Sequence, residues 1–480
     1  MNLTKSLASG FLWTFIETFV LKGVSIFASI LMARILGPEK IGIFGMTSIF
    51  LAIGLSLVDS GMSSSLIRTK NTNDKDYSTV FFLNILIGIL VYSITFISSP
   101  LIADFFNQKI LIDVIRVYGL VFIISAFSSV QLAIITKELR FKSIMKLNLP
   151  GTIIGSFVGV ICAYKGLGVW SLVIMYLLIQ LITTILLWFS SNWRPKFYYS
   201  PSIAKSHFKF GYKLTISGIL NAFFSNIYNV IIGKAFPVQT LGFFDRARLF
   251  NDLPVQTLTG IIDRVSFPLI SSIQDDRTKV SDVSKNILII TFFIIAPIML
   301  GAAALAKPLF FVVLGQKWLD AVPFFQILCL SGIFYPIHAF NINLLKVFGR
   351  SDLFLKLEIF KVILISISVF IGIQFGIYGL LWSSVCSSYV ALYINTYYSG
   401  KIFGYSFKDQ ITNMFPILLI SLITSLSMYL ILMFSIINSF LTQILVAGFL
   451  GMIIYITLYK LLYPTPLNML VNYIKKIRND

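Results

Sequence analysis

Charged residues are scarce in this sequence, and acidic residues are the scarcest of them. Only 12% of the 480 residues are charged, and only 19 residues are Asp or Glu, whereas 57% are hydrophobic and the mean hydropathy is +0.89. Soluble domains carry about 25% charged residues, which cover their surface. The shortage of charge therefore excludes a soluble globular protein of this length.

Histidine and cysteine are also rare. His207 falls in an expected loop and His338 in an expected helix, while Cys162, Cys329 and Cys386 lie in apolar segments without metal-ligand spacing. We expect the cysteines to be small buried hydrophobic residues. The sequence therefore predicts neither a metal site nor a histidine-based catalytic set, and we expect a protein that is not an enzyme and has no cofactor.

What the sequence does contain is a succession of apolar runs. Each run is about 18 to 25 residues long, enough for a helix to cross a hydrocarbon core of about 30 Å. No segment shows the alternation of a strand, and helices satisfy their own backbone groups in lipid. The pattern predicts an all-α integral membrane protein with about 14 transmembrane helices, at residues 9–34, 39–60, 78–98, 112–136, 147–164, 168–189, 211–233, 241–270, 286–306, 322–345, 355–373, 377–398, 411–434 and 440–462.

The net charge of +19 comes from loops and tails. With the N-terminus in the cytoplasm, most of the 38 Lys and Arg residues fall in cytoplasmic loops, as the positive-inside rule requires. We therefore expect a multi-pass protein with both termini cytoplasmic, and no nucleic-acid partner. The short loops leave no room for an extramembrane catalytic domain.

An internal repeat divides the chain. The stretch Met32–Phe44 resembles Ile232–Phe244 at an offset of 200, with Gly42 opposite Gly242, and Gly166–Ser171 resembles Gly376–Ser383. The repeat predicts a six-helix lobe at 1–190, a second at 191–400, and helices 13 and 14 with a basic cytoplasmic tail at 401–480. Two parallel halves around a shared cavity are typical of transporters.

Polar side chains recur at helical spacing in three of the expected helices. Ionisable residues inside spans usually face a cavity or a partner helix. The stripes comprise Thr14, Thr18, Lys22, Ser25 and Ser29 with Glu17 beside them; Ser217, Asn221, Ser225 and Asn229; and Asp245, Arg248, Asp252, Gln256, Thr259 and Asp263. They predict a wet central cavity that contains Lys22 and Arg248.

Other interpretations of these residues stay open. Serine and threonine stripes also mark close helix packing, and Arg248 can pair with Asp252 or Asp245 at helical spacing. Arg246 is a further candidate, although it lies about 200° around the helix from Arg248. Asp59, Asp263 and Arg264 lie near expected helix ends, where they form either an inner gate or interface anchors.

A cationic cavity implies an anionic substrate. The guanidinium fork of Arg binds two oxygens of a diphosphate at once, while Lys supplies a point charge. A membrane-embedded anion with an apolar tail and a polar head suits a cavity that opens sideways to lipid.

Several ordered motifs identify a family resemblance. They are LMARILGPEKIGIFG at Leu31–Gly45, SGMSSSLIR at Ser60–Arg68, LRFKSI at Leu139–Ile144, GLGVWSL at Gly166–Leu172, WRPKF at Trp193–Phe197, SFPLISSIQ at Ser266–Gln274 and GQKWLDAVP at Gly315–Pro323. With them the chain resembles bacterial polysaccharide exporters of the Wzx type (O-antigen flippases), in the WzxC-like branch of the MOP superfamily.

The resemblance implies a V-shaped bundle of two six-helix lobes plus a helix pair, in the bacterial cytoplasmic membrane. It implies a flippase that moves oligosaccharide on undecaprenyl diphosphate from the inner to the outer leaflet, for lipopolysaccharide, capsule or exopolysaccharide synthesis. The implied partners are this lipid-linked oligosaccharide, membrane lipids, and polysaccharide polymerase and chain-length machinery.

The resemblance also bears on single residues. In the related lipid II flippases, cations of the first and eighth helices line the cavity, and Lys22 and Arg248 fall at similar places. Many relatives have Asp where this chain has Tyr228, which leaves Glu17, Asp59, Asp252 and Asp263 to couple transport to H⁺ or Na⁺.

Two alternative functions are open. A multidrug or metabolite cation-coupled antiporter shares the expected architecture, but carboxylates are expected to dominate its cavity. A membrane glycan polymerase or ligase is less favoured, because it would need a large loop that bears catalytic residues.

Overall fold

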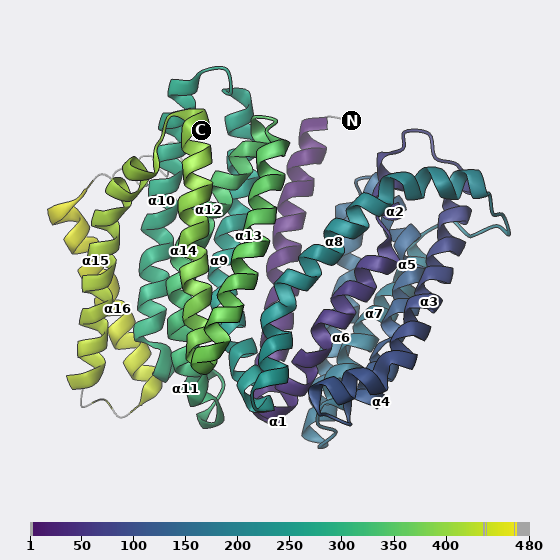
Figure 1. The fold of residues 1–480 in the computed structure, drawn as a ribbon, viewed down its shortest axis with the longest axis horizontal. Coiled ribbons are helices and arrows are strands. Elements are labelled where there is room, and N and C mark those ends of the chain that lie inside the picture. The colour runs from purple at the N-terminus through teal and green to yellow at the C-terminus, as the bar shows by residue number, and fades with distance from the viewer. Residues whose placement is uncertain (1–2, 435–436, 438, 465, 468–480) are drawn as a thin grey trace. The chain divides into compact units, whose positions relative to one another are not determined.

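Helices account for nearly all of the computed structural model (Figure 1), which describes residues 3–434, 437, 439–464 and 466–467, with side chains from Lys22 onward except Ser351. The described residues contain no strand. Ten described segments are long and apolar enough to cross a membrane by length and composition alone. The predicted all-α membrane fold is confirmed.

Each of the 14 predicted spans has a counterpart among the described helices. Gly37, with φ 74° and ψ 176°, and Pro38 divide α1 into the first two, and α4 and α5 together form the fourth. The long helices are α1 (Leu3–Asp59), α3 (Asp74–Phe106), α4 (Leu111–Tyr118), α5 (Leu120–Lys137), α6 (Phe141–Tyr164), α7 (Trp170–Ser190), α8 (Pro201–Ala235), α9 (Val238–Ser272), α10 (Arg277–Ala304), α12 (Val322–Val347), α13 (Ser351–Gly372), α14 (Gly376–Phe403), α15 (Phe407–Phe434) and α16 (Phe440–Leu462).

Four short helices were not predicted. They are α2 (Met62–Arg68), α11 (Ala306–Val313) and the 3₁₀ helices η1 (Gln316–Ala321) and η2 (Ile373–Phe375). Each lies in a connection between long helices and is too short to show a helical period in the sequence.

The chain forms two compact units, Met1–Gly242 and Phe243–Asp480. In the first unit α1 packs against α6 and α8, while α3, α5 and α7 pack in turn on one another. Asn229 of α8 donates a hydrogen bond to Ser48 of α1 at 3.1 Å. The predicted lobe limits at residues 190 and 400 stay a prediction; α8 packs against α1, α2 and α3 of the first unit.

The two copies of the repeat meet within the first unit. A Cβ added to Gly42 would overlap the carbonyl oxygen of Val238, and a Cβ added to Gly242 would overlap that of Pro38. Pro38 and Val238 are themselves 200 residues apart, as the two glycines are. The contact therefore has approximate twofold symmetry, and both glycines are needed because backbone approaches backbone there.

In the second unit α12 packs against α10 and α14, α14 against α13, and α15 against α10 and α16 (Figure 1). A buried polar network joins three of these helices. Asn341 of α12 donates to Gln410 of α15 at 3.1 Å and accepts from Ser399 of α14 at 2.6 Å. Because buried amides are costly unless bonded, this network fixes how the three helices pack.

Candidate functional site

Three polar side chains of α9 follow one another on one helical face. Arg248 Nε forms an ion pair with Asp252 Oδ2 at 3.5 Å, and the same oxygen accepts a hydrogen bond from Gln256 Nε2 at 3.5 Å. Asn251 Nδ2 donates to Asp252 Oδ1 at 3.0 Å. The residues are four apart, which is one turn of helix. We call Arg248, Asp252 and Gln256 the α9 polar row.

Beside the row, α9 has a buried contact with α12. Asn251 is buried, and its Oδ1 would lie only 2.5 Å from a Cβ added to Gly332 of α12. Arg248 and Asp252 remain 35% and 30% exposed in their side chains. Packing therefore fixes α9 while it leaves the charged groups of the row accessible.

Arg246 is in a different environment. Its Nη2 lies 2.8 Å from Asp245 Oδ2, and its side chain is only 11% exposed. Both arginines thus pair with carboxylates of their own helix, and for Arg248 the partner is Asp252, as one of the open interpretations holds. Arg248 is the more accessible of the two, because Arg246 is largely covered.

The predicted residues of α1 lie in the first unit. Lys22 and Ser25 are exposed, and they lie one turn apart near the start of the described side chains. The side chains of Glu17 and Thr18 fall outside the described residues. A joint cavity of Lys22 with the α9 polar row stays a prediction.

The α8 stripe divides into two environments. Asn221 and Ser225 are exposed and bonded to each other at 3.3 Å. Asn229 is buried against α1. Its amide therefore serves helix packing in this unit, and the accessible polar surface of α8 lies nearer Asn221.

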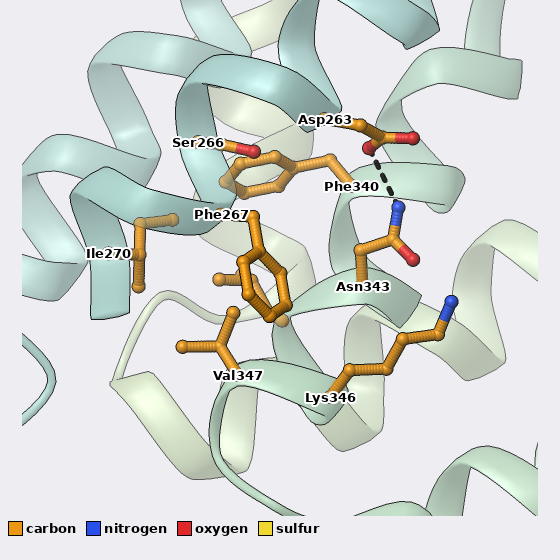
Figure 2. Close-up of a pocket in the computed structure, with 9 residues that line it drawn as sticks. Asp263, Ser266, Phe267, Ile270, Phe340, Asn343, Lys346 and Val347 are labelled. Atoms are coloured by element: carbon orange, nitrogen blue, oxygen red, sulfur yellow. Dashed lines mark hydrogen bonds between the residues drawn. The ribbon is translucent and has the colours of Figure 1, made fainter. Parts of the chain in front are cut away.

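A pocket of about 250 Å³ lies where the later part of α9 meets the last turns of α12 (Figure 2). Asn343 Nδ2 donates to Asp263 Oδ1 at 2.7 Å, and Lys346 extends from α12 beside this pair. Phe267 and Phe340 supply apolar wall. The full lining is Asp263, Ser266, Phe267, Ile270, Phe340, Asn343, Leu344, Lys346 and Val347. The sequence patterns predicted Asp263 alone from this set, because the contribution of α12 depends on how the helices pack.

The other two gate candidates are exposed. Asp59 ends α1, just before Ser60 and Gly61 at φ 50° and 61°, and Arg264 follows Asp263 on α9. An inner gate made by these residues stays a prediction. The structure ties Asp263 to α12 of its own unit.

One buried cluster was missed by the sequence patterns. His207 lies inside α8 rather than in a loop, because the helix already begins at Pro201. Its Nδ1 is 2.8 Å from Ser65 Oγ of α2, and its Nε2 is 3.6 Å from Asp76 Oδ1 of α3. All three side chains are largely covered, and Asp76 also completes the capping box of α3 with Asn73. The cluster therefore holds α8 against α2 and α3, and we call it the His207 clamp.

Most of the residues described above lie in a segment that matches a known protein family. The family described as "Polysaccharide biosynthesis protein" matches residues 31–323, from within α1 to the start of α12. The chain belongs to this family. The match includes the α9 polar row, Asp263 and the whole of α8.

Several known proteins resemble the chain over about two thirds or more of its length. The teichuronic acid biosynthesis protein TuaB of Bacillus subtilis is 24% identical over 78% of both chains. The lipopolysaccharide biosynthesis protein WzxC of Escherichia coli is 26% identical over 78% of this chain and 76% of that protein. The succinoglycan biosynthesis transport protein ExoT of Rhizobium meliloti is 25% identical over 67% and 65%.

Two solved structures share the fold. The lipid II flippase MurJ superposes over 94% of this chain and 99% of its own, with a TM-score of 0.76 and 18% identity. An inward-facing MATE multidrug transporter of the MOP superfamily covers 82% and 98%, with a TM-score of 0.61 and 15% identity. The chain therefore has the fold of these two transporters, as the family resemblance implied.

Proposed function

We propose that this protein is a flippase that moves an oligosaccharide linked to undecaprenyl diphosphate across the bacterial cytoplasmic membrane. Membership of the polysaccharide biosynthesis family supports this, as does the similarity to the succinoglycan transport protein ExoT and to the lipid II flippase MurJ. The observation that carries the proposal is the α9 polar row, which keeps an accessible arginine on a long helix inside the segment that matches this family.

Arg248 is suited to bind a diphosphate. A guanidinium has five N–H donors in a fixed planar geometry. Asp252 can therefore orient the group through Nε while the other N–H groups donate hydrogen bonds to phosphate oxygens. Lys22 of α1 supplies a second cation. Arg246 is a third cation of the proposed site, and it forms an ion pair with Asp245. We expect the glycan to bind accessible polar side chains such as Asn221 and Ser225 of α8, while the prenyl chain stays in lipid.

Alternating access then moves the head group without covalent chemistry. A coupling cation, H⁺ or Na⁺, resets the cycle at a carboxylate such as Asp252, since one charge moved through 100 mV supplies about 2.3 kcal/mol. When the cation binds Asp252, the partner of Arg248 is neutralised, which alters the hold of Arg248 on the phosphate. Polysaccharide polymerase and chain-length machinery receive the flipped product.

The test is polymer export in a strain that lacks the chromosomal copy of this gene. We expect Arg248→Ala to lower export about 10- to 100-fold, because a hydrogen bond to a charged group contributes roughly 1.5–3 kcal/mol. Arg248→Lys should keep part of the activity, and Arg248→Ala with Lys22→Ala should abolish it while lipid-linked oligosaccharide accumulates on the inner side.

Lys361→Ala is the matched control. Lys361 is also a cation within a helix of the second unit and also pairs with a carboxylate, Glu358, at 3.4 Å. It lies on α13 and should tolerate the change. Full export by the double variant at normal protein level would refute the assignment. Resistance to cationic drugs that depends on the gene, without an effect on polymer, would favour the antiporter.

A further inference from the structure

A second pocket of the second unit lies between α13 and α14. It has a volume of about 420 Å³ and is lined by Leu353, Lys356, Leu357, Phe360, Tyr393, Ile394, Tyr397 and Tyr398. We call it the α13–α14 groove. The residues come from the first three turns of α13 and the last three turns of α14, so the groove lies at one end of both helices.

The groove combines an apolar floor with an aromatic and cationic rim. Leu357 is buried in the floor, whereas Phe360, Tyr393 and Tyr397 are about half exposed. Lys356 is exposed on the α13 wall. Lys401 follows the groove on α14, and its ammonium lies 4.3 Å from the centre of the Tyr397 ring. Tyrosines of this kind are enriched where a helix crosses from lipid into the headgroup layer.

The acidic residues at this end have other partners. Arg350 holds Asp352 through two hydrogen bonds of 3.0 and 2.9 Å, which lower the pKa of that carboxyl to about 2. Glu358 pairs with Lys361, and Asp409 accepts from the Ser406 hydroxyl. Among the described residues, no carboxylate forms an ion pair with Lys356 or Lys401. The rim is therefore a site of net positive charge beside an apolar surface.

We propose that the α13–α14 groove binds an anionic membrane phospholipid. Lys356 and Lys401 hold the headgroup phosphate, Tyr397 positions Lys401 through its ring, and an acyl chain lies along Leu357, Phe360 and Ile394. Basic pockets between membrane helices bind acidic headgroups in this way. A phospholipid is chosen over a soluble anion because the floor is apolar, and a soluble phosphate would leave that floor uncovered.

The experiment uses the full-length protein in nanodiscs of phosphatidylcholine with increasing phosphatidylglycerol, followed by native mass spectrometry of retained lipid. We expect wild type to retain phosphatidylglycerol in preference to phosphatidylcholine. Lys356→Gln with Lys401→Gln should weaken that retention about 30-fold, since each basic residue near an anionic headgroup contributes roughly fivefold. Tyr397→Phe, which keeps the ring under Lys401, should weaken it much less than Tyr397→Ala.

Lys408→Gln is the control, because Lys408 is exposed at the start of α15 and does not line the groove. Equal retention of the two lipids by wild type, or equal loss with Lys408→Gln, would overturn the proposal. Displacement of the bound lipid by undecaprenyl phosphate at equimolar amounts would also overturn it, since the groove would then belong to the cargo.

Discussion

His207 connects α8 to α2 and α3, two neighbouring helices that lie far earlier in the sequence. It contacts Ser65 of α2 and Asp76 of α3 from its place on α8. We expect His207→Ala to lower the free energy of unfolding by about 1–3 kcal/mol, because Ser65 and Asp76 lose a buried partner. Thermal unfolding of the purified protein measures this. Ser206→Ala, at the exposed neighbouring position, is the control, and an equal midpoint for both variants would contradict the clamp.

At the scale of single residues, the sequence predicted side-chain pairs within one helix but not contacts between helices. The pairing of Arg248 with Asp252 was among the interpretations that the sequence left open, because a separation of four residues brings side chains together on a helix. Asn343 and Lys346 beside Asp263 could not be anticipated, because they come from a helix 80 residues later. The same limit applies to the contact of Asn229 with Ser48.

At the scale of helices, apolar runs predicted which segments are helical but not where they end. The predicted span at 78–98 is part of α3, which begins at Asp74 because Asn73 and Asp76 form a capping box. Likewise α8 starts ten residues before the predicted 211, with Pro201 in its first turn. Membrane length sets a minimum for a span, while caps and packing in the loops set the true ends.

The crossing of the two repeat copies offers a test at the same scale. Gly42→Ala should destabilise the protein by about 1–3 kcal/mol or more, because the added methyl group meets the Val238 carbonyl and forces two backbones apart. Gly242→Ala should act similarly through Pro38. Gly45→Ala is the control one turn away, where a Cβ would lie 3.5 Å from Leu241, an ordinary contact. Thermal unfolding again measures the difference, and equal stability of Gly42→Ala and Gly45→Ala would exclude a close crossing.

At the scale of the whole molecule, the distribution of charge predicts how the chain lies in the membrane. Lys70 lies between α2 and α3, and Lys165 lies between α6 and α7. Three membrane crossings separate them: α3, the α4–α5 pair and α6. The loops on the side of Lys70 carry most of the positive charge, so the positive-inside rule puts Lys70 in the cytoplasm and Lys165 outside.

This orientation decides the direction of the proposed transport, and it can be measured with cysteine labelling. Cys162, Cys329 and Cys386 are first replaced by Ala. In intact cells a membrane-impermeant thiol reagent should then label Lys165→Cys but not Lys70→Cys, and after permeabilisation it should label both, because both positions are exposed. Labelling of Lys70→Cys but not Lys165→Cys in intact cells would show that the protein has the opposite orientation. It would also place the basic ends of α12, α13 and α14 on the outer side of the membrane, against the positive-inside rule.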